Sequence, residues 1–156
     1  MQKIKGYYLE RVRGTQKVRP SRQGRITSYL LNYLRSVPGS QNHMASAVSR
    51  QQVEEALDSG AFQNEERDSY WIEHSEHGRI GYIRFEDLCD DTPVFDLRLA
   101  SQWQGRGLGV EVLNAATTWI FEQKPRIRRF EGQTRDDNLA MRHTFLMVVR
   151  ESASYR

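Results

Sequence analysis

One stretch decides the fold, VFDLRLASQWQGRGLGVEVLNAATTWIF at residues 94–121. Its first part alternates apolar and polar side chains, and this period of two predicts a strand with one buried face. Its last part carries an apolar stripe at a spacing of three to four residues, which predicts a helix. The members of this stripe are Leu108, Val112, Leu113, Ala116 and Ile120. The stretch therefore predicts a strand that turns directly into a long helix.

Between the strand and the helix lies a glycine-rich turn, QGRGLG at residues 104–109. Its three glycines keep side-chain bulk away from the turn, so a ligand can approach the bare backbone. The first amides of the following helix have no intrahelical partner and carry partial positive charge. Such a turn suits a phosphate or pyrophosphate group. An ordinary glycine-rich turn without a ligand is the alternative.

Two common phosphate-binding patterns do not fit this turn. A dinucleotide fingerprint that begins at Gly105 requires glycine at position 110, where the chain has Val110. A Walker loop ends in Gly-Lys-Ser/Thr, whereas this turn continues as Gly109-Val110-Glu111. The pattern that fits is Gln-x-x-Gly-x-Gly, which resembles the acetyl-CoA loop of the GNAT N-acetyltransferase superfamily. The order of strand, loop and long helix also resembles the central unit of that family.

A second segment, RFEGQTRDDNLAMRHTF at residues 129–145, resembles GNAT sequences as well. It is most similar to the branch that includes the ribosomal-protein N-terminal acetyltransferases, where a strand carrying Glu leads into Asn-x-x-Ala/Ser. With the hairpin before them, the two segments cover about residues 68–147, whereas residues 1–67 resemble the family only in plan. The resemblance implies a single domain over residues 1–156 with an α+β, three-layer fold, in which helices flank a mixed, mostly antiparallel sheet.

The resemblance also implies where acetyl-CoA binds. The strand residues would pair with the pantetheine arm as an added strand does, and the glycine-rich turn would hold the pyrophosphate, with Arg106 adding charge. An asparagine would lie near the thiol end. The cofactor-binding residues implied in this way are Leu97, Arg98, Leu99, Gln104, Gly105, Arg106, Gly107, Leu108, Gly109 and Asn138.

Acetyl transfer to an amine requires a base, because an ammonium group has no lone pair with which to attack. By the resemblance, Glu131 is the first choice for this base, and a salt bridge to a neighbouring arginine is the alternative role. Asp96 is the second choice, and a solvated strand position is its alternative. His143 is interpreted as a surface or capping histidine. Many family members have a tyrosine as general acid where this chain has Phe145, so the acid stays unassigned.

Local patterns predict the remaining elements. Strands are expected at residues 6–12, 68–74, 79–85 and 127–134, and helices at about 25–34, 49–58 and from 136 onwards. Ser49 begins a capping-box pattern, SRQQ. One last strand fits within residues 148–155, whereas a second does not, and this leaves an open sheet edge. Either a second copy of the chain covers that edge as a homodimer, or the chain is a shortened, impaired family member.

Composition and charge narrow the class of protein. The length of 156 residues suits one domain, and no apolar run approaches the roughly 18 residues that a membrane span needs. There is no apolar signal segment, no zinc-type Cys/His spacing and only one cysteine, so we expect a cytoplasmic protein without a metal. Residues 1–25 carry eight Lys/Arg against one acid. Solvated surface is the favoured interpretation of this basic end, and nucleic-acid binding is not expected.

The acidic loop at residues 86–93 has two interpretations as well. It is either a solvated turn, which we favour, or a border of the acceptor site that attracts a cationic amine. Its lone Cys89 is a poor nucleophile, because neighbouring negative charge disfavours the thiolate.

The sequence therefore predicts an acetyl-CoA-dependent N-acetyltransferase. The acceptor is expected to be a primary amine, at a protein or peptide N-terminus or on a small molecule, that attacks directly in a ternary complex. A non-catalytic acyl-CoA-binding or interaction protein on a degenerate GNAT fold is the alternative.

Overall fold

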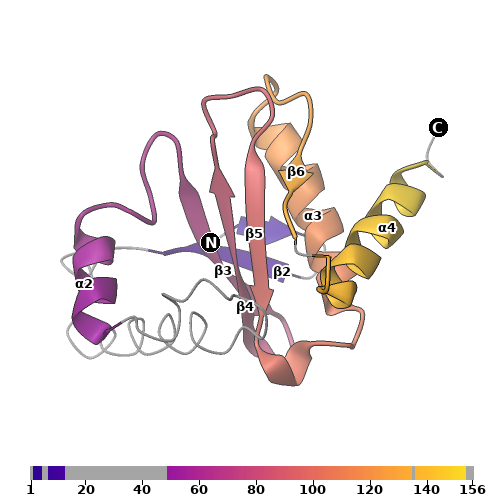
Figure 1. Cartoon of the computed structure of the whole chain (residues 1–156), viewed down its shortest axis with the longest axis horizontal. Coiled ribbons are helices and arrows are strands. Elements are labelled where there is room, and N and C mark those ends of the chain that lie inside the picture. The colour runs from indigo at the N-terminus through magenta and orange to yellow at the C-terminus, as the bar shows by residue number, and fades with distance from the viewer. Residues whose placement is uncertain (1, 5–6, 13–48, 135, 154–156) are drawn as a thin grey trace.

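The computed structural model describes residues 2–4, 7–12, 49–134 and 136–153. These residues form a six-stranded sheet with helices on both of its faces (Figure 1). The strands neighbour one another in chain order, and all pairs are antiparallel except the last, β5 with β6, which is parallel. The strands are β1 (Gln2–Ile4), β2 (Tyr7–Arg11), β3 (Asp68–His74), β4 (Gly78–Glu86), β5 (Val94–Leu99) and β6 (Glu131–Gly132). The predicted mixed, mostly antiparallel sheet flanked by helices is confirmed.

The main core lies between the sheet and α3 (Leu108–Gln123). Phe95 and Leu97 project from β5 into this core, as the alternation along the strand predicts. The whole apolar stripe predicted for α3 is buried there too. The strand-turn-helix unit at residues 94–121 is therefore confirmed.

The opposite face of the sheet is covered in part by α2 (Arg50–Asp58). Val53 and Leu57 of this helix belong to a second apolar cluster that includes Trp71 and Tyr82 of the sheet. The predicted capping box is present, because the Ser49 hydroxyl accepts a hydrogen bond from the Gln52 amide and the Ser49 amide donates one to the Gln52 side-chain oxygen. The helix expected at about residues 25–34 lies outside the described residues.

The strand pair β5–β6 is very short. Val94 pairs with Glu131 and Phe95 pairs with Gly132, and there the ladder ends. The strand predicted over residues 127–134 is therefore wrong for most of its length. Before β6, the amides of Arg128 and Arg129 both donate to the carbonyl of Asp91, at 2.7 and 3.3 Å, and two donors on one acceptor cannot continue a ladder.

The end of the described chain also differs from the expectation. The strand predicted within residues 148–155 is wrong, because α4 (Leu139–Ala153) runs through most of this range. Met141, Phe145 and Val148 follow a spacing of four and three, and all three pack on the main core. Phe145 and Val148 thus continue one helical face, whereas Leu146 is exposed, and β6 is the last strand of the sheet that the described residues form.

A residue larger than glycine at position 132 should destabilise the protein. A Cβ there would lie 2.6 Å from ring atoms of Phe95 and Phe145, and overpacking of this kind costs roughly 1–3 kcal/mol. We expect Gly132→Ala to lower the free energy of unfolding by about this amount in urea denaturation. Adding Phe145→Leu should recover part of the loss, and a double variant that recovers nothing would contradict this packing.

Candidate active site

The glycine-rich turn connects β5 to α3 by way of a short 3-10 helix, η2 (Ser101–Trp103). Gly105 and Gly107 have φ values of +71° and +80°, in the left-handed region that favours glycine. A Cβ at either position would meet no described atom within 4 Å. These two glycines therefore set the course of the backbone and leave open space above it, as a site for a bulky anion requires.

The first turn of α3 supplies hydrogen-bond donors to this space. Gly107 is the N-cap residue and has no side chain with which to cap the helix. The first amides bonded within the helix belong to Val110 and Glu111, which donate to the Gly107 carbonyl at 3.0 and 3.4 Å. The amides of Leu108 and Gly109 precede them and have no partner within the helix. Their partial positive charge suits phosphate oxygens, so the turn fits a pyrophosphate.

A column of stacked side chains supports the turn. His77 stacks on Trp103 at 4.6 Å between ring centroids, and on His74 at 4.4 Å. At one end of the column the Arg106 guanidinium lies 5.2 Å from the Trp103 ring, and at the other end Tyr7 meets His74 edge-on at 5.2 Å. The column therefore ties the turn to β2 and β3. Its rings come from three separate parts of the chain, and the sequence analysis did not find it.

Tyr7, at the far end of the column, is joined to α3 by a hydrogen bond. The Tyr7 hydroxyl donates to Oε2 of Glu111 at 2.7 Å, in the first turn of the helix. Burial, and then the hydrogen bond and charge of Glu111, raise the pKa of Tyr7 well above its ordinary value. The phenol therefore stays protonated and holds this carboxylate toward β2.

Beyond its two residues paired with β6, one edge of β5 has no strand partner among the described residues, and this free edge lies next to the turn. The Ala100 amide donates to the Ile80 carbonyl on the β4 side, at 3.0 Å. Because backbone groups of a strand point alternately to its two sides, those of Leu97 and Leu99 point to the β6 side, beyond the end of the β5–β6 ladder. The Gln104 side chain donates to the Leu99 carbonyl at 2.8 Å, so the turn's glutamine contacts the chain's own backbone. Of the three strand residues predicted to bind cofactor, Arg98 differs from the other two. Its backbone N–H and C=O groups point toward β4 and not toward the free edge.

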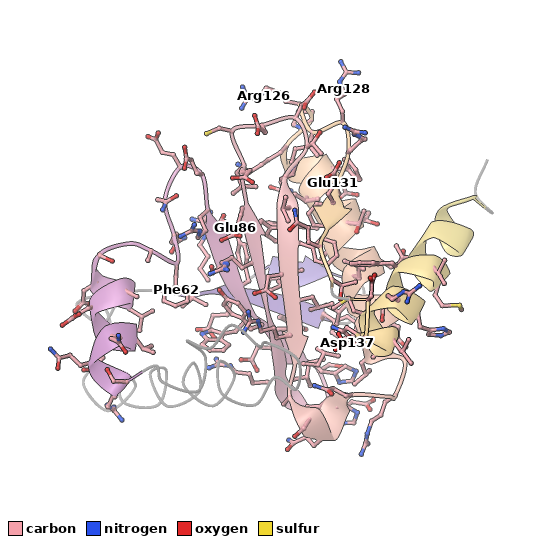
Figure 2. All side chains as sticks on the ribbon, in the orientation of Figure 1. Phe62, Glu86, Arg126, Arg128, Glu131 and Asp137 are labelled. Carbon is pink, nitrogen blue, oxygen red and sulfur yellow. The ribbon has the colours of Figure 1, made fainter. Side chains whose placement is uncertain are left out.

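The two candidate bases share one face of the sheet. Asp96 alternates with buried Phe95, and Glu131 pairs with Val94, so both side chains project opposite the α3 core. Figure 2 shows Glu131 on β6, at the outer side of β5. Arg98 holds both oxygens of Asp96, through Nε at 3.1 and 2.9 Å. Among the described residues, Arg129 approaches Glu131 to 3.8 Å, and Glu131 is 49% exposed, so it is held less closely than Asp96.

Two further predicted positions belong to α4 and its start. The Asn138 side-chain oxygen accepts a hydrogen bond from the Met141 amide at 3.1 Å, so this asparagine caps the helix. Phe145 meets Phe95 edge-on, with ring centroids 5.6 Å apart. Its ring fills the core beside β6 and offers no proton. His143 is exposed on α4.

The acidic loop at residues 86–93 lies at the start of β5, whereas the glycine-rich turn lies beyond its end. In Figure 2 this end of the sheet carries Arg126 and Arg128, far from the turn. Cys89 is exposed there as a free thiol. The loop therefore does not border the glycine-rich turn.

The described residues offer neither a metal-binding cluster nor a membrane-spanning helix. They contain no group of three or more His, Cys, Asp or Glu side chains arranged to hold a metal ion. Among their helices, none combines the length and apolar character that crossing a membrane requires.

Comparison with known proteins places the chain among acetyltransferases. A family model described as an acetyltransferase (GNAT) domain matches residues 19–146. No curated protein sequence matches. Spermidine N-acetyltransferase from Vibrio cholerae, solved with CoA and spermine, is 14% identical with a TM-score of 0.68, over 92% of this chain and 79% of that one.

Two more solved structures have the same fold. A ribosomal L7/L12 α-N-protein acetyltransferase, solved with CoA, is 18% identical with a TM-score of 0.66, over 90% of this chain and 77% of that one. An aminoglycoside acetyltransferase, solved with coenzyme A, is 14% identical with a TM-score of 0.63, over 91% and 81% of the two chains.

Burial of the Tyr7 phenol, together with its hydrogen bond to Glu111, should make the free energy of unfolding fall at high pH. The folded pKa of Tyr7 is raised above its unfolded value of about 10, so the stabilisation is complete below pH 10 and is lost as pH rises further. We measure the free energy of unfolding in urea between pH 8 and 11.5. It should fall less steeply with pH in Tyr7→Phe than in the wild type, by at most about 1.4 kcal/mol per pH unit. Tyr8→Phe on the same strand is the control. Identical slopes for wild type and Tyr7→Phe would exclude this role.

Proposed function

Since the chain belongs to the GNAT acetyltransferase family, we propose that it transfers the acetyl group of acetyl-CoA to a primary amine. Membership makes it an acetyltransferase, and the proposal concerns its donor, its acceptor and the residues that act. One observation carries the proposal: an open, uncapped helix start with two glycines at positive φ lies directly beyond the free edge of β5.

The donor in this proposal is acetyl-CoA. The amides of Leu108 and Gly109 would bind the pyrophosphate, and Arg106 would add a positive charge beside them. The backbone of Leu97 and Leu99 would pair with the amides of the pantetheine arm, because the register leaves their groups on the β6 side. Coenzyme A in all three of the structural neighbours described above supports this choice.

The acceptor in this proposal is a primary amine, at a peptide N-terminus or on a small molecule. Its neutral nitrogen attacks the thioester carbonyl, the new C–N bond forms and the C–S bond breaks. An α-amine with a pKa near 8 loses its proton more readily than a lysine near 10.4. Glu131 takes this proton, directly or through a water molecule, and Asp96 is the second candidate. A backbone amide on the free edge of β5 would stabilise the oxyanion.

The leaving thiolate needs little help in this scheme. A thiol with a pKa near 8.5, like that of cysteine, can depart as the thiolate. Phe145 has no proton to give, so protonation of the sulfur is assigned to water. Binding of acetyl-CoA without any transfer would instead favour a non-catalytic acyl-CoA-binding protein.

Calorimetric titration of acetyl-CoA tests the donor site. We expect micromolar binding by the wild type, with a Kd of about 1–50 µM, and loss of binding in Gly107→Glu, because a carboxylate would occupy the phosphate position. Gly60→Glu is the matched control, since Gly60 also has a positive φ, of +77°, but lies after α2. Both variants carry the same kind of backbone strain. Equal loss of binding in the two variants would mean that strain, and not the site, is responsible.

Glu131→Gln tests the base. Removal of a general base typically costs 10²–10⁴-fold, so we expect kcat to fall at least about 100-fold while the Kd for acetyl-CoA is unchanged. Glu122→Gln, an exposed acid at the far end of α3, should keep wild-type kcat. Full activity in Glu131→Gln with a large loss in Asp96→Asn would transfer the role to Asp96.

A further inference from the structure

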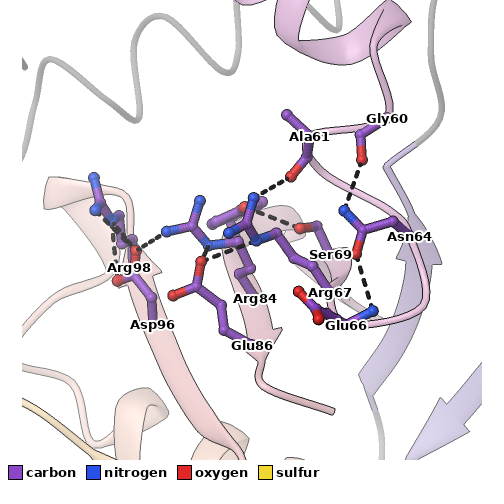
Figure 3. Close-up of polar contacts among 11 residues, drawn as sticks. Gly60, Ala61, Asn64, Glu66, Arg67, Ser69, Arg84, Glu86, Asp96 and Arg98 are labelled. Carbon is purple, nitrogen blue, oxygen red and sulfur yellow. Dashed lines mark hydrogen bonds and ion pairs between the residues drawn. The ribbon is translucent and has the colours of Figure 1, made fainter. Parts of the chain in front are cut away.

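The face of the sheet that carries Asp96 holds a chain of alternating charges (Figure 3). Nε of Arg67 and Nε of Arg84 both approach Oε1 of Glu86, at 3.0 and 3.1 Å. Nη2 of Arg84 lies 3.9 Å from Asp96, and Nη2 of Arg98 lies 2.8 Å from the same carboxylate. Three guanidinium groups thus share two carboxylates. The group as a whole has a surplus of one positive charge.

Arg84, at the centre of this group, has the poorest partners. Its buried Nε forms the 3.1 Å ion pair with Glu86 but, like Nε of Arg67, makes no hydrogen bond among the described residues, and its approach to Asp96 is too long for a hydrogen bond. By contrast, Arg98 hydrogen-bonds to both oxygens of Asp96, and Arg67 donates to the Ala61 carbonyl at 2.9 Å. Only 27% of the Arg84 side chain is exposed. A cation held in this way is stabilised by a further anion.

This cation lies beside the candidate bases. Arg84 pairs with Asp96 across the β4–β5 ladder, so the two side chains share a face, and Glu131 lies on the same face one strand beyond. On the opposite face, the core packs against α3 and α4 and fills the space under β5. An acceptor amine that reaches the free edge of β5 from outside this core therefore passes the arginine group.

We propose that Arg84 binds a carboxylate of the acceptor, so that the acceptor is a primary amine with an acidic group close to its reacting nitrogen. This inference rests on the function proposed above, because it concerns the same transfer site. Acidic peptide N-termini and small acidic amino acids have this chemistry. A polyamine does not, because its ammonium groups add to the existing surplus of positive charge.

Matched acceptors test the charge preference. The CoA-loaded protein is titrated with the peptides Ser-Glu-Glu-Ala and Ser-Gln-Gln-Ala, both amidated at the C-terminus, with free glutamate as the small acidic acceptor and with spermidine. We expect the acidic peptide to bind about tenfold more tightly than its neutral isostere, as one arginine–carboxylate hydrogen bond provides. Arg84→Gln should abolish this ratio and Arg84→Lys should keep part of it. Arg126→Gln, at an exposed arginine far from the group, should leave it unchanged.

A separate assay supplies acetyl-CoA and an acceptor and measures the release of CoA. It distinguishes failure of this inference from failure of the proposed acetyl transfer. Equal binding of the two peptides by the wild type, or tighter binding of spermidine, overturns the inference, whether or not CoA is released. Selective binding of the acidic peptide without CoA release overturns the proposed function and leaves the carboxylate site of Arg84 standing. If urea denaturation shows that Arg84→Gln does not fold, the inference is judged on Arg84→Lys and the wild type. Their ratios of affinity for the acidic and the neutral peptide then decide it. Tighter binding of glutamate than of the peptide assigns the site to small acidic amines.

Discussion

The structure depends on the separation of β5 from β6 after only two paired residues. At the point of separation, the rings of Phe95 and Phe145 occupy the space beside Gly132, and no side chain fits between them. Beyond it, one side of β5 has no strand partner among the described residues, while its other side stays paired with β4. A half-paired strand that runs into a glycine-rich turn gives a linear substrate both a backbone to pair with and a place for its charged end.

Much of this arrangement could be predicted because its signals are local. The strand-turn-helix unit has two clear periods with glycines between them, and the capping box at Ser49 needs only four neighbouring residues. The residue types of the turn predict a backbone that needs glycine, and Gly105 and Gly107 do adopt such angles, while phosphate binding there stays a prediction. Local chemistry decides these features, so the sequence suffices.

Other features depend on contacts that the sequence does not display. The apolar run after Phe145 suits a strand or a helix, and packing of Val148 on the core selects the helix. The segment before β6 reads as a strand, yet the Asp91 carbonyl captures two of its amides. The stacking of His77 on Trp103 requires the β3–β4 turn to meet the end of β5. The surroundings of Asp96 and Glu131 differ for the same reason, since Arg98 hydrogen-bonds to Asp96 whereas Arg129 approaches Glu131 only to 3.8 Å.

The chain-order arrangement of the strands has a consequence for local stability. Neighbours from β3 to β5 are joined by the loops at residues 75–77 and 87–93 and by long ladders, whereas β6 is reached through the whole of α3 and is held by a ladder of two residues. Amide protons of β6 should therefore exchange with solvent through small openings that leave the β3–β5 meander intact. Local stability of the sheet is therefore expected to decrease from β3–β5 to β6. The short β6 strand adjoins the edge of β5 that a substrate would use, so separation of β6 from β5 need not disturb the core.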